Sequence, residues 1–416
     1  MRRVTNLKNI HIEFLKILES FMHDTTYELP EDFCGFQELY KIAVEHQVSS
    51  IVYEQIRTSS VIQKDEYRQM MTIWKRSAIR EIMMQVQRTE GFLSVYKAMS
   101  DAGLKPLVVK GIVCRNMYSK PDYRISGDED LLLSKQDFAK CDQILIEQGF
   151  ARSELDMDHL PYEIPYIHPK NGVYIELHLS LFEEASDAYG HLNDEFKDVF
   201  DHCISENIQE RKVWTLSPTD HLFYLICHSF KHFLHSGFGM RQVCDMVMMA
   251  ECYGAQIDWD YIKEKLFRLN MESYWNALVK ISVKYLGFSL EKACYPEDVL
   301  DSEVDYRPLL MDLLDSGIYG GSSMERKHSS NMTLTAMAGG KANTTASLRS
   351  SLFPSAAYMK RKFSWVKKYP WLLPAAYVVR IVKYLQTSKD KPKDEKNSVQ
   401  IGMERVELLK QYHIIK

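Results

Sequence analysis

The sequence predicts a mixed α+β fold in which a small sheet core lies between helical regions at both ends of the chain. Apolar residues recur close to the helical spacing up to about Gly103. Short apolar runs at residues 106–109 and 130–133 are then typical of buried strands. From about Asp201 onward the pattern becomes helical again.

The predicted sheet core is built from three stretches. PLVV forms a short strand that ends at Lys110-Gly111, and DLLL forms a second strand. A helix follows from Ser134, and we expect it to end at Gly149. The stretch YEIPYIHPKNGVYIELHLSL predicts two strands joined at residues 169–172, because Asn-Gly favours a hairpin turn.

The second half of the chain predicts several helices and a less regular tail. One helix begins with Ser217 as its cap and Pro218 at its first position. A second follows at MRQVCDMVMMAECYG, and a third covers roughly Trp259 to Leu286. The expected regions are an N-terminal helical region (1–103), a sheet core (104–200), a helical domain (201–316), a Gly/Ser-rich flexible loop or linker (317–350) and a basic, aromatic tail (351–416) that fades into a charged segment before a final short helix.

Charge and cysteine content exclude several classes of protein. The net charge is only −4, so no global field favours nucleic acid. The eight cysteines are scattered without a CxxC pair, which fits a reducing cytoplasm better than a disulfide framework. The most apolar window, YPWLLPAAYVVRIVKYL, carries prolines and charges that a membrane span would not. We therefore expect a soluble, cytoplasmic protein.

Three consecutive acids, Asp128-Glu129-Asp130, stand directly before the leucines of the second strand. Carboxylates beside a hydrophobic core are costly unless a cation balances them. Alternate side chains of a strand share a face, so Asp128 and Asp130 point the same way and Glu129 points elsewhere. Such a pair repels unless a divalent cation lies between the carboxylates, and Mg²⁺ prefers oxygen ligands of this kind.

A third carboxylate is available on the hairpin. In VYIELHLS the apolar residues occupy one face, and Glu176 and His178 share the other. If the two strands are neighbours, Glu176 completes a triad with the aspartates, which is the usual apparatus for attack on a phosphoryl group. Lys110, Gly111 and Arg124 would then contact the phosphates. His178 could orient a ligand, although a lone histidine on a strand more often has a structural role. An Asp-x-Asp pair alone is more often a solvated turn, but this ordered combination favours function.

The stretch VVKGIVCRNMYSKPDYRISGDEDLLLS, followed by YIELHLSLF, resembles the nucleotidyltransferase superfamily related to DNA polymerase β, and within it an uncharacterised bacterial branch. The resemblance covers roughly residues 75–185. It implies transfer of a nucleoside monophosphate from an NTP to a hydroxyl-bearing acceptor, with release of pyrophosphate and with two Mg²⁺ ions as cofactors. By position it implies Asp128, Asp130 and Glu176 as metal ligands, with Glu176 also as the base.

Two differences from the superfamily pattern keep alternatives open. Gly111-Ile112 stands where Gly-Ser or Gly-Gly is common, and the third acid is Glu176 rather than aspartate. These differences give weight to one alternative, a regulatory module that keeps the fold and binds nucleotide without turnover. A sugar-nucleotide glycosyltransferase is a further alternative, because an Asp-x-Asp pair also holds a metal-bound diphosphate there.

Other motifs have less specific readings. His228, His232 and His235 have spacings that suit a metal site on one helix, but helix-packing or substrate-domain histidines are the favoured interpretation. The helical region with His228, His232, Arg241 and Asp245 is also similar to the family, less specifically. Arg241 and Asp245 predict a surface ion pair or, alternatively, part of an acceptor pocket. The basic, aromatic tail suits weak contact with an anionic membrane or nucleic acid as well as it suits a packing segment. The sequence does not identify the acceptor.

Overall fold

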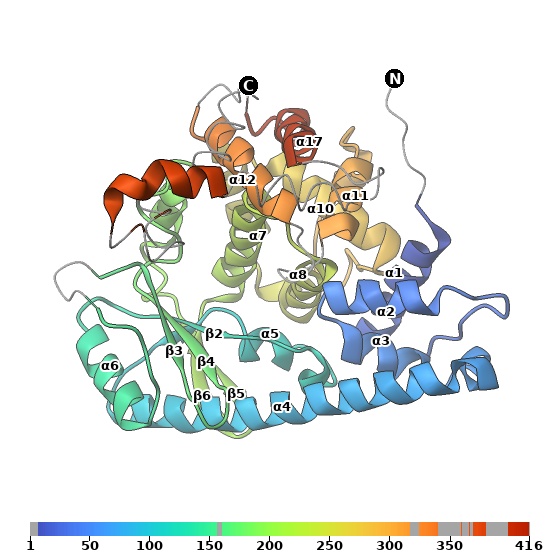
Figure 1. Cartoon of the computed structure of the whole chain (residues 1–416), viewed down its shortest axis with the longest axis horizontal. Coiled ribbons are helices and arrows are strands. Elements are labelled where there is room, and N and C mark those ends of the chain that lie inside the picture. Colours follow the sequence, from blue (N-terminus) through green and yellow to red (C-terminus); the bar gives the residue numbers. More distant parts are fainter. Residues whose placement is uncertain are drawn as a thin grey trace.

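The computed structural model describes residues 7–155, 160–316 and 324–339 and, toward the C-terminus, residues 359, 366, 369–379 and 398–415. The predicted mixed α+β fold is confirmed. A four-stranded sheet and a separate two-stranded sheet lie beside a larger body of helices (Figure 1).

The N-terminal region is helical, as predicted. Its three short helices pack on one another, and α3 packs against a much longer fourth helix, α4, which continues beneath the sheet (Figure 1). Trp74 of α4 is fully buried, and its indole nitrogen donates to the Ser49 carbonyl oxygen at 3.1 Å. Gly103 ends this region with φ +80°, a conformation that favours glycine. The helices are α1 (Asn9–Met22), α2 (Phe36–Glu45), α3 (Ser49–Ile56) and α4 (Arg68–Asp101).

The four-stranded sheet has the order β1-β2-β4-β3. β3 and β4 form the predicted antiparallel hairpin, and Gly172 takes φ +66° in its turn. β2 pairs with β4 in parallel, so Asp130 lies directly opposite Glu176. The strands are β1 (Leu107–Val108), β2 (Glu129–Leu132), β3 (Glu163–Ile167) and β4 (Tyr174–His178).

Side chains of the sheet divide as the alternation predicts. Ile175 and Leu177 of β4 are fully buried, in a hydrophobic cluster that includes Phe92 of α4. Glu176 and His178 point to the opposite face. Two helices connect the strands, α5 (Ile112–Asn116) and α6 (Phe138–Glu147). The second begins at Phe138 rather than at Ser134, whose hydroxyl donates to the carboxylate of Asp137 at 2.7 Å.

The expectation of helix from about Asp201 is wrong for the first residues of that region. They form an antiparallel hairpin of β5 (Ile204–Ile208) and β6 (Arg211–Thr215). Gln209 and Glu210 at its turn have φ values of +47° and +65°. Neither residue type signals a turn of this kind, because Asn and Gly are the usual residues there. The sequence therefore carried no marker for the hairpin.

The remaining helices form the body above the sheet. Ser217 caps α7 as predicted, with its hydroxyl accepting from the Asp220 amide at 3.2 Å. The single helix expected from Trp259 to Leu286 is wrong, because Asn270 takes φ +55° and divides it into two. The helices are α7 (Pro218–Leu234), α8 (Met240–Tyr253), α9 (Trp259–Arg268), α10 (Glu272–Tyr285) and α11 (Arg307–Ser316).

The segment 317–350, expected as a flexible loop, contains helix α12 (Met324–Met337). This helix packs against the predicted final helix, α17 (Ser398–Gln411). Thr333 of α12 also donates to the carbonyl oxygen of Leu234, which fastens the helix to the end of α7. Most of the basic, aromatic tail lies outside the described residues, so its expected membrane or nucleic-acid contact stays a prediction.

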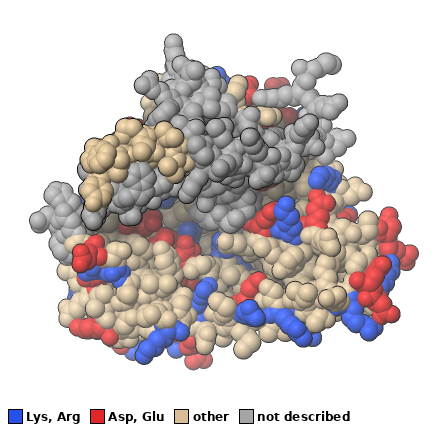
Figure 2. All heavy atoms as spheres, viewed as in Figure 1, with Lys and Arg blue, Asp and Glu red and all other residues tan. Residues whose placement is uncertain are grey.

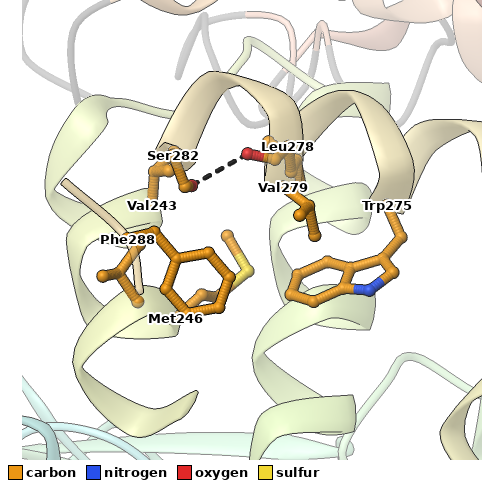
Figure 3. Close-up of a pocket in the computed structure, with 8 residues that line it drawn as sticks. Val243, Met246, Trp275, Leu278, Val279, Ser282 and Phe288 are labelled. Atoms are coloured by element: carbon orange, nitrogen blue, oxygen red, sulfur yellow. Dashed lines mark hydrogen bonds between the residues drawn. The ribbon is translucent and has the colours of Figure 1, made fainter. Parts of the chain in front are cut away.

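Helices from the two ends of the chain share one hydrophobic core. α1 contacts both α8 and α10. The packing between α8 and α10 leaves a cavity of about 10 Å³, lined almost entirely by apolar side chains (Figure 3). A space of that size barely holds one water molecule, so it is a packing defect and not a ligand site.

The distribution of surface charge and the hydrophobicity of the helices agree with the nearly balanced charge of the sequence. Among the described residues on the face shown in Figure 2, basic and acidic side chains are interspersed and do not form a broad patch of one sign. Among the described helices, not one combines the length and the hydrophobicity that crossing a bilayer requires.

Candidate active site

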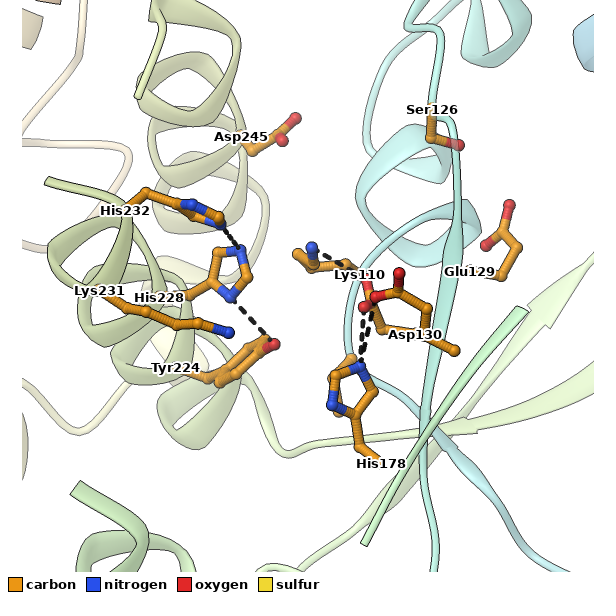
Figure 4. Close-up of polar contacts among 12 residues, drawn as sticks. Lys110, Ser126, Glu129, Asp130, His178, Tyr224, His228, Lys231, His232 and Asp245 are labelled. Carbon is orange, nitrogen blue, oxygen red and sulfur yellow. Dashed lines mark hydrogen bonds and ion pairs between the residues drawn. The ribbon is translucent and has the colours of Figure 1, made fainter. Parts of the chain in front are cut away.

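Asp130 lies at the centre of the candidate site, on β2, and only 1% of its surface is exposed. The ammonium of Lys110 lies 2.9 Å from Oδ2, and Nε2 of His178 lies 3.0 Å from Oδ1 (Figure 4). Burial alone would raise the pKa of Asp130, but Lys110 and His178 outweigh it and hold the pKa well below its usual range. Asp130 is therefore ionised at neutral pH despite its burial.

Glu176 lies opposite Asp130 on the neighbouring parallel strand, and its pKa is shifted in the opposite direction. Burial, followed by the charge of Asp130, raises the pKa of Glu176 from 4.5 to about 8. Ligand atoms of Asp130, Glu176 and His178 all lie within 4.8 Å of one another. Within the described part of the chain, this is the one group of acids and histidines close enough together to hold a metal ion.

Asp128 lies beside this group, in the turn that leads into β2. It is half-buried and is not one of the residues in the 4.8 Å group. Its charge contributes to the raised pKa values of both Lys110 and Glu176, as that of a nearby carboxylate would. The sequence expected Asp128, Asp130 and Glu176 to converge, and the structure brings all three to one end of the β2–β4 pair.

Glu129 points away from Asp130, as the strand alternation predicts (Figure 4). Its carboxylate lies 2.7 Å from Nη1 of Arg115, and the two side chains are almost fully buried. It also accepts a hydrogen bond from the Ile112 amide at 2.6 Å. The amide of Ile112, directly after Lys110-Gly111, therefore donates to a carboxylate of the protein. The sequence instead predicted that a phosphate would approach this part of the backbone.

Gly111 is required by this arrangement. Its φ is +63°, and a Cβ atom added there would lie 1.9 Å from Oε2 of Glu129. We expect Gly111→Ala to lower the free energy of unfolding by at least about 1–3 kcal/mol, because backbone strain and the displaced carboxylate act together. Urea unfolding measures the loss. Gly127→Ala is the matched control, since a Cβ at Gly127 meets no atom within 4 Å; equal losses for the two variants would contradict the prediction.

Arg124 has a carboxylate partner that the sequence did not reveal. Its Nε donates to Oδ1 of Asp245 at 3.0 Å, its Nη2 pairs with Oδ2, and the hydroxyl of Tyr118 donates to Oδ1 at 2.9 Å. Burial would lower the pKa of Arg124, but Asp245 outweighs it and raises the pKa. The prediction that Asp245 pairs with Arg241 on the surface is wrong, because both residues are buried and the partner of Asp245 lies 121 positions away.

A cavity of about 110 Å³ adjoins the acids. Lys110, Gly111 and Asp128 line one side of it, and residues of α7 and α8 line the other. Arg124, expected to serve phosphate, also reaches this cavity while paired with Asp245. Of the three acids, Asp128 lines this cavity, and Asp130 is next to it through its ion pair with Lys110.

Helix α7 supplies the wall that faces the acids (Figure 4). His228 and His232 are buried, and their Nε2 atoms lie 2.7 Å apart. Burial lowers the pKa of each histidine well below 6.5, so both are neutral. They form a hydrogen-bonded pair, and His235 instead contacts the hydroxyl of Tyr189 at 3.1 Å. The favoured interpretation, helix-packing or substrate-domain histidines, agrees with this arrangement, in which His228 also lines the cavity.

Comparison with known proteins identifies the family to which the chain belongs. The sequence matches the family described as uncharacterised nucleotidyltransferase over residues 35–287, more than half of the chain. No curated protein is similar enough to match. A crystal structure of an antigenic nucleotidyltransferase-like protein from Paracoccidioides brasiliensis aligns with 52% of this chain and 97% of its own, at 13% identity and a TM-score of 0.32. The family match gives no support to the glycosyltransferase alternative.

Proposed function

Because the chain belongs to this uncharacterised nucleotidyltransferase family, we propose that it transfers a nucleoside monophosphate from an NTP to a hydroxyl-bearing acceptor. The acceptor oxygen forms a bond to the α-phosphorus, the bond from that phosphorus to the bridging oxygen breaks, and pyrophosphate leaves. The observation that carries the proposal is the pairing of Asp130 with Glu176 across adjacent parallel strands, next to Lys110, which lines the cavity.

The residues present fit a divalent cation. The charge of Asp130 helps to raise the pKa of Glu176, and a cation between the two side chains would lower that pKa again and favour the carboxylate form of both. We propose that Asp128, Asp130 and Glu176 hold Mg²⁺, which prefers oxygen ligands. Such an ion would offset the negative charge that develops on the phosphate oxygens. His178 would keep Asp130 in position through its 3.0 Å contact.

The other side chains have roles that follow from their positions. Glu176 as a carboxylate would accept the proton of the acceptor hydroxyl. Lys110, whose ammonium now pairs with Asp130, lines the cavity and would contact a phosphate oxygen there. Arg124 would contribute positive charge to the same cavity, with Asp245 and Tyr118 fixing its orientation.

The test is release of pyrophosphate by the full chain, supplied in turn with each of the four common NTPs, Mg²⁺ and a cell extract as the source of acceptor. We expect release with at least one NTP, and its loss when EDTA removes the metal. Absence of release with every NTP and every extract would contradict the proposal.

One observation favours a second function, a nucleotide-binding module without turnover. Lys110 already neutralises Asp130, and Glu129 already accepts from the Ile112 amide, so two groups expected to serve metal or phosphate have protein partners. Tight ATP binding that is insensitive to Mg²⁺, without pyrophosphate release, would identify this function.

A further inference from the structure

Arg241, in the first turn of α8, is a buried cation with incomplete pairing. Its exposed fraction is 8%. One Nη atom donates to the carbonyl oxygen of Ile125, but its Nε has no hydrogen-bond partner among the described residues. No ion pair joins Arg241 to a carboxylate of any described residue. Asp245, four positions along the same helix, is held by Arg124 instead.

The carboxylates of Asp245 and Asp128 lie near Arg241 without pairing with it, and they compensate its charge only in part. Burial, followed by the neighbouring charge of Arg124, lowers the pKa of Arg241 to about 10. A buried guanidinium without a carboxylate is costly, and an anion brought beside it would offset that cost. Arg241 also lines the 110 Å³ cavity, so an anion in the cavity would reach it.

Other features of the cavity agree with a polar ligand beside Arg241. Oε1 of Gln242, the next residue, is buried without a partner among the described residues, and Gln242 lines the same cavity. The first turn of α8, at the positive end of the helix dipole, borders this space through Arg241 and Gln242. His46 already accepts the Met240 amide at 3.1 Å, which fixes the start of the helix.

We propose that Arg241 forms an oxyanion subsite that binds a phosphate group of a substrate in this cavity. The ligand class rests on the proposed function, whereas the anion site itself rests on the geometry of Arg241. A small oxyanion fits, because a water molecule needs only about 10–15 Å³ of such volume and the cavity offers about 110 Å³. Lys110 and Arg124 line the same space. Two acids also line it, Asp128 and Asp245, and Asp245 is paired with Arg124.

Two substrates would bring a phosphate to this subsite, the NTP through its terminal phosphate or the acceptor through a phosphate of its own. If the NTP brings it, loss of Arg241 weakens binding of ATP and of inorganic tripolyphosphate and leaves AMP unchanged. If the acceptor brings it, ATP binding is unchanged, but inorganic phosphate no longer binds to the ATP-saturated protein. Either pattern supports the subsite.

The experiment is calorimetric titration of the full chain with tripolyphosphate, ATP, AMP and inorganic phosphate, in EDTA so that no turnover occurs. We expect Arg241→Met to weaken the affected ligand about ten- to hundredfold, as loss of a charged hydrogen bond would. Arg241→Lys keeps the charge but loses the planar guanidinium, so its affinity should lie between those of the wild type and Arg241→Met. Arg80→Met, at an exposed position of α4, is the matched control and should bind as the wild type does.

A thermal unfolding scan separates binding from a structural role. Arg241→Met without ligand should unfold at the same temperature as the wild type or at a higher one, because an incompletely compensated buried charge is removed. If Arg241→Met does not fold, Arg241→Lys alone tests the proposal, and a weaker affinity than that of the wild type supports it. Equal affinity of wild type and both variants for every probe would overturn the proposal, even if pyrophosphate release is confirmed. Conversely, Arg241-dependent binding without any turnover would leave the subsite standing and count against the proposed transfer.

Discussion

Asp130→Asn is expected to reduce Mg²⁺-dependent pyrophosphate release by about a hundred- to thousandfold, the effect typical of removing one charge-stabilising group from an active site. Asp130 is the acid around which Lys110, His178 and Glu176 converge. An asparagine keeps the shape but supplies no negative charge for a cation. Initial rates of pyrophosphate release at saturating NTP measure the loss. Asp101→Asn, the same change at an exposed position of α4, should leave the rate unchanged.

The same substitution also has a cost in stability that must be separated from its effect on activity. Without the Asp130 carboxylate, Lys110 keeps its charge in a largely buried position, and unpairing a buried ion costs about 3–5 kcal/mol. The double variant Lys110→Met, Asp130→Asn removes both charges and should recover much of that stability. It should remain inactive. Recovery of activity together with stability would show that Asp130 has only a structural role.

Glu176→Gln is expected to have the second large effect, a loss of activity of about a hundredfold or more, because it removes both a proposed ligand and the proposed base. Glu176→Asp keeps the charge but shortens the side chain by one methylene, so it should retain part of the activity. Single-turnover measurements across a Mg²⁺ series distinguish weaker metal binding from a slower chemical step. Glu147→Gln, at an exposed position of α6, is the control. Full activity of Glu176→Gln would rule out both proposed roles.

The pH dependence of stability provides a readout for Glu176 that does not need turnover. In EDTA, the pKa of Glu176 is raised from 4.5 to about 8, so the folded protein binds a proton that the unfolded chain releases. The stabilisation from that proton is complete below about pH 4.5 and is lost as the pH rises through about 8. Glutamine has no such proton, so the stability of Glu176→Gln relative to the wild type should increase over this range. A constant difference between the two proteins would contradict the raised pKa.

The sequence predicted the local geometry of the acids well, because alternation along a strand is a local property. The pattern of VYIELHLS assigned Glu176 and His178 to the polar face of β4, and the structure agrees. Whether β4 lies beside β2 depends on the order of strands in the sheet, which one strand's pattern does not contain. The parallel pairing that puts Asp130 opposite Glu176 therefore came from the structure.

Long-range partners account for most of what the sequence did not predict. Arg241 and Asp245 have ion-pair spacing on one helix, but Asp245 binds Arg124 from the sheet core. The sequence pattern indicated no partner for Glu129, although Arg115 lies only 14 positions earlier, in the short helix α5. Backbone conformations without a residue signal caused the other errors, at the β5–β6 turn and at Asn270. The deciding contacts join residues that are far apart in the sequence. The deciding backbone angles occur at residue types that do not signal them.

The central claim is that Asp130 and Glu176 hold a divalent cation for nucleotidyl transfer. The most direct measurement is anomalous diffraction from crystals grown with Mn²⁺ and a non-hydrolysable NTP analogue. We expect a Mn²⁺ peak about 2.0–2.4 Å from carboxylate oxygens of both residues, with the ammonium of Lys110 moved from Asp130 toward a phosphate oxygen. A bound analogue with no peak between the two carboxylates, and with Lys110 still paired to Asp130, would contradict it.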